Sequence, residues 1–303
     1  MKLSELLHLR QTLLSIDVSQ IEVASKKLVE EAQNVPWLKY DSTNVISSLS
    51  NALSSIGDFR NNVSAFIMQL DKDIKELDAV YKERCKKEEV FHLRASVQDN
   101  RELRKKFVHD DIKKLVTGRL AHYISWNQTG MEIGPGDGTW TEYLVALDPL
   151  YLVDIHEEFL NSTKVKFDPA YQRRLRTYCI PHADLSTLPK DQFGFVFAWN
   201  VFEYFGLLTI KKYLEELFTL LKPGGVVMFS YNNCENYKSV EMFESHFMTY
   251  VPNRDLVKIV KDIGYEIISA RDEPTMTSWL EIKKPGSLTS IRAGQTLGKI
   301  KLV

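Results

Sequence analysis

The sequence has few cysteines, no long apolar run and almost no net charge. Its 303 residues include three cysteines, Cys85, Cys179 and Cys234, at separations that match no metal-ligand motif. We therefore expect reduced thiols, no metal site and a cytoplasmic protein. No run approaches the roughly 18 apolar residues that span a bilayer, and the N-terminus mixes in polar residues unlike a secretory signal, so we expect no membrane contact. The net charge of −1 argues against general nucleic-acid binding, which depends on neutralising phosphates.

Glycine and proline are nearly missing from the first 100 residues, where only Gly57 and Pro36 occur. Without these helix breakers, the apolar periodicity predicts helices. A first helix, which Pro36 is expected to end or interrupt, has its apolar face at Leu6, Leu9, Leu13, Ile16, Val23 and Leu28. In a second, longer helix the apolar residues alternate at steps of three and four, as in a coiled-coil seam, at Leu49, Leu53, Ile56, Phe59, Val63, Phe66, Leu70, Ile74, Leu77 and Tyr81.

The apolar stripe from Leu49 to Tyr81 is too long to remain exposed on a monomer, so something must cover it. Three arrangements are open: a helical hairpin within one chain, contact with a second copy or another protein, and a lid over a substrate site. We predict an all-α, coiled-coil-like N-terminal domain over residues 1–100 that also mediates homo-oligomerisation. The polar stretch 94–100 breaks the apolar pattern and is the expected linker.

A run of glycines in the second third of the chain predicts a ligand-binding turn. Glu132 is followed by Gly134, Gly136 and Gly138, directly after a short apolar run. Glycine at alternate positions lets the backbone turn sharply out of a strand and approach a ligand. About 22 residues after Glu132, Asp154 ends a second predicted strand, where a carboxylate can accept hydrogen bonds from ribose hydroxyls. Together these residues predict a pocket for an adenosine-containing cofactor.

The spacing of these glycines resembles motif I of the class I S-adenosylmethionine-dependent methyltransferases rather than the dinucleotide fingerprint G-x-G-x-x-G. Further segments of that family are matched in order, including the turn Lys222-Pro223-Gly224-Gly225 before a predicted fifth strand, at 179–185, 193–204, 217–230, 256–268 and 278–282. The resemblance covers roughly residues 105 to 285. It implies an α/β fold with a Rossmann-like, seven-stranded methyltransferase sheet whose last strand is antiparallel. The predicted domains are 1–100, 101–285 and a C-terminal extension, 286–303.

The resemblance also implies roles for individual residues. Glu132 and the three glycines would surround the methionyl part of S-adenosylmethionine, and Asp154 would hold the ribose. The adenine and the methyl group would be contacted by Ile155, Asp184, Leu185 and Asn200. Each polar residue could instead serve only a turn or a cap. Substrate-side candidates follow the fourth and fifth predicted strands or lie in the insertion after them: Glu203, Tyr204, Tyr231, Asn232 and His246.

The expected function is methyl transfer by in-line displacement to a small molecule or to a protein side chain, for which a general base is optional. Many small-molecule members have histidine where this chain has Tyr204, which puts a histidine-assisted mechanism there in doubt. The amino-methylase signature Asn-Pro-Pro-Tyr is missing, which lowers the case for DNA bases as substrates. The main alternative is a non-catalytic interaction or assembly module that acts through its N-terminal helices. The glycine spacing disfavours a dinucleotide-dependent oxidoreductase.

Overall fold

The computed structural model describes residues 2–15, 23, 26–27, 30–31, 43–86, 110–180, 183–272 and 278–288. The chain divides into two compact units, residues 1–81 and 82–303. The predicted domain boundary at residue 100 and most of the predicted extension 286–303 lie outside the described residues. Within the described part of the chain, no helix combines the length and the apolar character that crossing a membrane requires.

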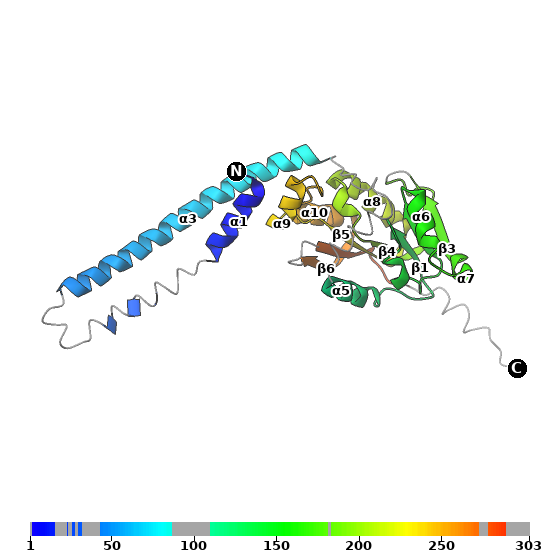
Figure 1. Ribbon diagram of the computed structural model, residues 1–303, viewed down its shortest axis with the longest axis horizontal. Helices are drawn as coiled ribbons and strands as arrows, with labels where there is room; N and C mark the ends of the chain where they lie inside the picture. Colours follow the sequence, from blue (N-terminus) through cyan, green and yellow to red (C-terminus); the bar gives the residue numbers. More distant parts are fainter. Residues whose placement is uncertain are drawn as a thin grey trace. The chain divides into compact units, whose positions relative to one another are not determined.

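Within the described residues of the first unit, the helices α1 and α3 run antiparallel, which confirms the predicted helical N-terminal region (Figure 1). Helix α1 spans Leu3–Leu14 and helix α3 spans Thr43–Cys85. The guanidinium of Arg10 on α1 pairs with Asp71 on α3. The first helix is predicted to continue toward Pro36, but α1 ends at Leu14; residues 23, 26–27 and 30–31 are again helical, and the rest of this stretch lies outside the described residues. Ser15 caps α1, with its backbone N–H and its hydroxyl both bonded to carbonyls of the last turn.

The second unit is built on a seven-stranded sheet in the order β3-β2-β1-β4-β5-β7-β6. Six of the strands are parallel to one another, and the seventh, β7, lies between β5 and β6 and is antiparallel to both, as the resemblance implies. This confirms the predicted Rossmann-like methyltransferase sheet. The strands are β1 Thr129–Ile133, β2 Leu150–Asp154, β3 Leu175–Cys179, β4 Phe193–Ala198, β5 Leu221–Tyr231, β6 Glu266–Asp272 and β7 Ser278–Lys283.

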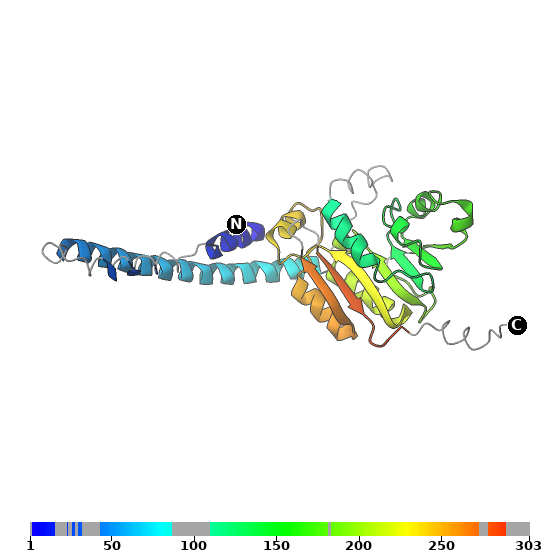
Figure 2. The ribbon, with the colours of Figure 1, turned by 90° about the horizontal axis from the view of Figure 1, so that it is seen from below.

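Helices cover both faces of this sheet, with α5 and α10 on opposite sides (Figure 2). Strand β5 shows the reason: Val227 and Phe229 pack in the cluster that contains α8 and α10, while Val226 and Met228 pack in the cluster that contains α5. Strands buried on both faces read as nearly continuous apolar runs. The short and long helices of this unit are α5 Asp110–Leu120, η3 Thr141–Tyr143, α6 Glu157–Lys164, α7 Pro169–Gln172, η4 Phe202–Tyr204, α8 Leu207–Leu220, α9 Tyr237–Glu244 and α10 Asn253–Ile263.

The predicted Lys-Pro-Gly-Gly turn before the fifth strand is part of the strand itself, because β5 begins at Leu221. Phe193 pairs with Leu221 but Phe195 pairs with Val226, so the intervening residues bulge out of the ladder. Gly224 has φ +80°, and its N–H donates to the carbonyl of Lys284. The glycines therefore form a bulge in β5, and the pairing between β4 and β5 continues on both sides of it.

Candidate cofactor and substrate site

The chain reverses its direction of strand addition at β1, which lies between β2 and β4. In open α/β sheets, ligands bind beyond the carboxyl ends of the strands at such a switch point. Glu132 lies near the end of β1, Asp154 ends β2, and Asn200 follows β4 by two residues. The structure therefore brings the predicted cofactor residues of three different strands to one edge of the sheet.

The glycine turn has the backbone that its sequence predicts. Gly134, Gly136 and Gly138 have φ values of +66°, +55° and +78°, in the left-handed region that favours glycine. The N–H of Gly138 donates to the carbonyl of Pro135 over 2.8 Å. A Cβ on Gly134 would lie 2.5 Å from the Cγ2 atom of Val201, in the segment after β4. Both the conformation and the close approach of the two segments thus require glycine at 134.

Side chains that the sequence analysis missed hold this turn in place. The carboxylate of Asp137, which is 3% exposed, accepts a hydrogen bond from the hydroxyl of Thr139 over 2.6 Å. The hydroxyl of Thr163 on α6 donates to the carbonyl of Gly136 over 3.0 Å. Thr163 lies 27 residues from its partner, and no local pattern signals the contact.

Two carboxylates at the ends of β1 and β2 are buried. Glu132 is 2% exposed and accepts a hydrogen bond from the hydroxyl of Thr141 over 2.5 Å. Asp154 is 8% exposed and accepts one from the backbone N–H of His156 over 2.8 Å. These contacts therefore help to orient both groups.

The predicted adenine residues differ in their surroundings. Asp184 is exposed, and its carboxylate accepts hydrogen bonds from the hydroxyl and the backbone N–H of Ser186, which lower the pKa of Asp184. Ile155 is half-buried after β2, whereas Leu185 is fully buried in the core beneath the sheet. Asp184 thus has the turn role that its residue type allows, and its contact with adenine stays a prediction.

Asn200, Ser230 and Glu203 form a connected group beyond the ends of β4 and β5. The backbone N–H of Asn200, which has φ +55°, donates to the hydroxyl of Ser230 over 2.7 Å. Ser230 is hydrogen-bonded to Glu203, which is 3% exposed. Burial raises the pKa of Glu203 to about 7, although the bond with Ser230 acts against the rise. The Oε2 atom of Glu203 has no hydrogen-bond partner among the described residues.

The other substrate-side candidates point in different directions. The buried Tyr231 donates its hydroxyl to Asn253 over 2.7 Å on the α10 side of the sheet, so it serves the core. Asn232 donates its amide to the carbonyl of Thr249 over 2.9 Å, and Thr249 in turn donates its hydroxyl to the carbonyl of Glu203. The Oδ1 atom of Asn232 is buried without a hydrogen-bond partner in the described structure. Tyr204 is half-buried, whereas His246 is exposed.

Three of the four residues other than glycine that have a positive φ in the described structure lie in segments that follow strands β3, β4 and β5; the fourth, Asp191, precedes β4. Ala183, Asn200 and His246 have φ values of +45°, +55° and +58°, and they follow β3, β4 and β5 respectively. Such conformations are strained for residues other than glycine and cluster at functional sites. Within the described residues, no group of histidine, cysteine and carboxylate side chains could hold a metal ion.

Comparison with known families agrees with this geometry. The profile of a family described as a methyltransferase domain matches residues 99–270, which is more than half of the chain. The chain belongs to this family. The predicted membership of the class I S-adenosylmethionine-dependent methyltransferases is thereby confirmed. No curated protein sequence matches the chain.

Solved structures similar to this methyltransferase domain come from several organisms. One is a complex of the Trm112 methyltransferase activator of Haloferax volcanii with a provisionally assigned methyltransferase (19% identity, 56% of this chain and 88% of that chain covered, TM-score 0.48). Another is an S-adenosylmethionine-dependent methyltransferase from Aquifex aeolicus (15% identity, 60% and 96% covered, TM-score 0.47). A third is such a methyltransferase from Mesorhizobium loti (10% identity, 55% and 96% covered, TM-score 0.47).

Proposed function

We propose that this methyltransferase binds S-adenosylmethionine at the glycine turn and transfers its methyl group to a small molecule or to a protein side chain. The observation that carries the proposal is the left-handed turn at Gly134, Gly136 and Gly138, flanked by the buried carboxylates of Glu132 and Asp154. The turn offers backbone without side chains to the methionyl part. Glu132 suits a molecule that carries an ammonium and a sulfonium, and Asp154 suits the ribose hydroxyls.

The remaining predicted residues complete the proposed cofactor site. Ile155 packs against the adenine, Asp184 accepts a hydrogen bond from its amino group, and the backbone of Leu185 donates to the ring. Asn200 lies beside the methyl group. When bound, S-adenosylmethionine would supply an electrophilic methyl group: a bond from the substrate nucleophile to the methyl carbon would form as the carbon–sulfur bond opposite it breaks, with S-adenosylhomocysteine as the leaving group.

An N–H or O–H group that becomes methylated must lose its proton, and we propose that the carboxylate of Glu203 is the base that accepts it. Its Oε2 atom has no partner in the described structure, and its pKa of about 7 lies near the optimum for a general base at neutral pH. Glu203 is joined through Ser230 to Asn200, which the proposal places beside the methyl group. The neighbouring Asn232 carries a second unpartnered acceptor, Oδ1. Substrates that present N–H or O–H donors would satisfy both acceptors.

Binding of the cofactor tests the first part of the proposal. In isothermal titration calorimetry we expect S-adenosylmethionine and S-adenosylhomocysteine to bind and NAD not to bind. Asp154→Ala is expected to weaken binding about ten- to a hundredfold, because charge-assisted hydrogen bonds to the ribose are lost. Asp154→Asn is the control, since its side-chain oxygen can still accept from the N–H of His156 and keep the local turn. Binding of NAD alone, or unchanged affinity in Asp154→Ala, would contradict the assignment.

A second proposal concerns the N-terminal helices. Along α3, Leu70 is 2% exposed, whereas Phe59 and Phe66 on the same stripe are 51% and 48% exposed. Half-exposed phenylalanines at seam positions suit a coiled-coil partner. We propose that the N-terminal domain, residues 1–100, pairs with a second copy of the chain through this stripe. Pairing of two copies is compatible with catalysis. A protein that pairs but transfers no methyl group would favour the alternative of a non-catalytic interaction or assembly module.

The oligomeric state tests this proposal through paired variants. The double variant Phe59→Glu, Phe66→Glu is expected to convert a dimer to a monomer in size-exclusion chromatography with light scattering, because charges at seam positions face the partner. Met68→Glu is the control, since Met68 is 73% exposed and lies off the stripe. A full-length protein that is already a monomer at micromolar concentration would refute the pairing.

A further inference from the structure

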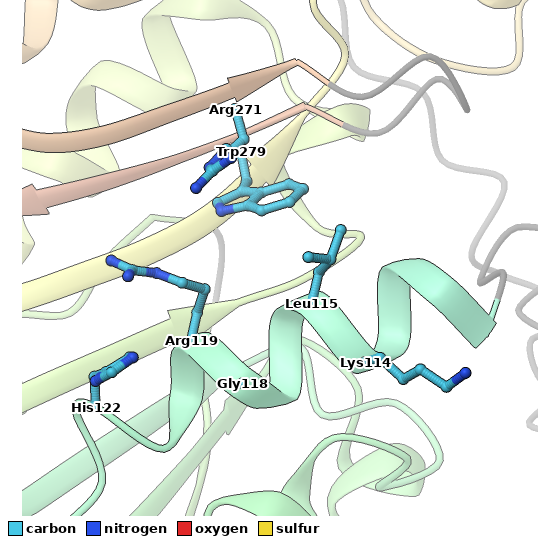
Figure 3. A pocket seen from close by; sticks show the side chains of 7 residues that line it. All are labelled: Lys114, Leu115, Gly118, Arg119, His122, Arg271 and Trp279. Carbon is cyan, nitrogen blue, oxygen red and sulfur yellow. The ribbon is translucent and has the colours of Figure 1, made fainter.

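A small hollow lies between α5 and the β6–β7 hairpin, and it shares no residue with the proposed cofactor site (Figure 3). Its volume is about 290 Å³, at the lower end of the range for small-molecule sites. Helix α5 supplies four lining residues, the turn after it supplies His122, and β6 and β7 supply one each: Lys114, Leu115, Gly118, Arg119, His122, Arg271 and Trp279.

The hollow exists because α5 covers β7 but carries no side chain at Gly118. Arg271 on β6 and Trp279 on β7 are paired across the hairpin and lie on the same face of the sheet. Trp279 is held from behind by Trp199, with ring centroids 5.6 Å apart. A Cβ built on Gly118 would meet no atom within 4 Å. The missing side chain therefore leaves a hollow at whose base Trp279, only 1% exposed, is nearly completely buried.

The hollow is lined by cationic groups on one side. In Figure 3 the nitrogen-bearing ends of Arg119, Arg271 and His122 lie on the same side of Trp279, while Lys114 points away. The Nε and Nη2 atoms of Arg119 donate hydrogen bonds to Glu281, and Nη2 also donates to the hydroxyl of Tyr123. Within the described part of the chain, the side chains of Arg271 and His122 have no hydrogen bond or ion pair, and no carboxylate lines the hollow. Glu281 offsets the charge of Arg119, so Arg271 supplies the unbalanced positive charge.

The other side of the hollow is apolar. Leu115, 47% exposed, stands beside the bare backbone of Gly118 and the ring of Trp279. A ligand that fits both sides has a flat or apolar body and an anionic head. Guanidinium groups bind carboxylate and phosphate oxygens with short, charge-assisted hydrogen bonds. The free Nη1 atom of Arg119 and the guanidinium of Arg271 offer such donors.

We propose that this hollow is a binding site for a small organic oxyanion, whose apolar body lies against Leu115, Gly118 and Trp279 and whose phosphate or carboxylate head is held by Arg271 and Arg119. The site is independent of the proposed cofactor site. Its ligand class is therefore testable on the full-length protein without S-adenosylmethionine and without a methyl acceptor.

The glycine that creates the hollow also supplies a matched pair of variants. Gly118→Leu fills the space, and it raises helix propensity rather than lowering it, so the protein should still fold. Gly57→Leu is the control, because Gly57 also lies in a helix with no atom near its added Cβ. A third variant, Arg271→Gln, removes the unpaired charge and leaves a shorter, neutral polar side chain. Arg119 is left unchanged because Glu281 depends on it.

Phenyl phosphate, benzoate, inorganic phosphate and phenol serve as probes, and the indole N–H resonance of Trp279, assigned with Trp279→Phe, is the readout. We expect phenyl phosphate or benzoate to shift this resonance saturably, and the probe that binds more tightly identifies the preferred head group.

Inorganic phosphate and phenol should bind at least about tenfold more weakly, since phosphate lacks the apolar body and phenol lacks the anionic head. Arg271→Gln should weaken binding about ten- to a hundredfold, and Gly118→Leu should abolish it while Gly57→Leu preserves it. The proposal is overturned if neither aromatic anion shifts Trp279, if inorganic phosphate binds as tightly as both, or if Gly118→Leu binds normally.

Discussion

Replacing Arg119 by alanine is expected to lower the free energy of unfolding by about 3–5 kcal/mol, the usual cost of breaking a buried ion pair from one side. Arg119 on α5 donates two hydrogen bonds to the carboxylate of Glu281 on β7, which is 0% exposed. Tyr123 and the indole of Trp279 also donate to that carboxylate. Removal of the guanidinium would leave a charged group buried against the sheet with only neutral donors.

The pH dependence separates this cause from a simple loss of packing. Burial by itself raises the pKa of Glu281, but the bonds from Arg119 and Tyr123 outweigh it and hold the pKa below 4.5. The stability gained from this group is therefore present above pH 4.5 and is lost as the pH falls through the folded-state pKa. Without Arg119, burial dominates and the pKa of Glu281 rises. The deficit of Arg119→Ala should then be largest at pH 7.5 and should narrow toward pH 4.5.

Urea denaturation at several pH values measures both effects. Lys114→Ala on the same helix is the control, since Lys114 and its partner Asp111 are 81% and 93% exposed and 3.9 Å apart. Such a surface pair is expected to change the free energy of unfolding by about 0.5 kcal/mol or less. An Arg119→Ala variant as stable as Lys114→Ala, or one whose deficit is independent of pH, would show that Glu281 does not depend on the ion pair.

The sequence was sufficient for the features that local chemistry determines. Apolar runs located the strands, and the alternate glycines located a turn whose φ values are all positive. The hairpin of β6 and β7 follows from its two apolar segments, although the sequence analysis needed the family resemblance to make it antiparallel. The length of α3 followed from the apolar periodicity, because no proline or glycine cluster interrupts residues 43–85.

The features that it did not predict depend on contacts between residues far apart in the sequence. Arg119 and Glu281 are separated by 162 residues, and Asn200 and Ser230 by 30. No periodicity or local motif links such pairs. The early end of α1 at Leu14 was missed because serine is tolerated within helices, so Ser15 gave no stop signal. The Lys-Pro-Gly-Gly turn was misjudged because proline and glycine favour both turns and bulges.

Replacing Glu203 by glutamine is expected to remove a pH dependence of stability worth about 3 kcal/mol, which is 1.36 kcal/mol for each unit between pKa values of 4.5 and about 7. Because the pKa in the folded protein exceeds the ordinary value of 4.5, the folded state binds the extra proton between these values. The contribution of Glu203 is therefore complete below pH 4.5 and is lost as the pH rises through 7. The variant should match the wild type near pH 4.5 and be more stable at pH 8.

Denaturant titrations of the wild type and Glu203→Gln from pH 4.5 to pH 8 measure this difference. Subtracting the free energy of unfolding of one protein from that of the other at each pH cancels the contributions of all other titrating groups. The same slope in both proteins would mean that Glu203 does not titrate in this range. That outcome would also remove the physical basis for its role as a base.

Catalysis provides the second measurement. Transfer of labelled methyl groups from S-adenosylmethionine into the protein and small-molecule fractions of a cell extract identifies the acceptor class. We expect Glu203→Gln to slow this transfer by roughly 10²–10⁴-fold, the usual contribution of a general base, with unchanged cofactor affinity. Normal transfer by this variant would leave Glu203 with a structural role alone.

Ser230 distinguishes a base from a buried carboxylate that only supports the fold. A base must be ionised to accept a proton, so the transfer rate should rise with pH through the pKa of Glu203, at about 7. The hydrogen bond from Ser230 lowers this pKa, and Ser230→Ala should raise it. The pH–rate profile should then move to higher pH in Ser230→Ala while the rate at high pH is largely retained. A structural carboxylate would give a profile that keeps its midpoint, because the loss of Ser230 would lower the rate at every pH alike.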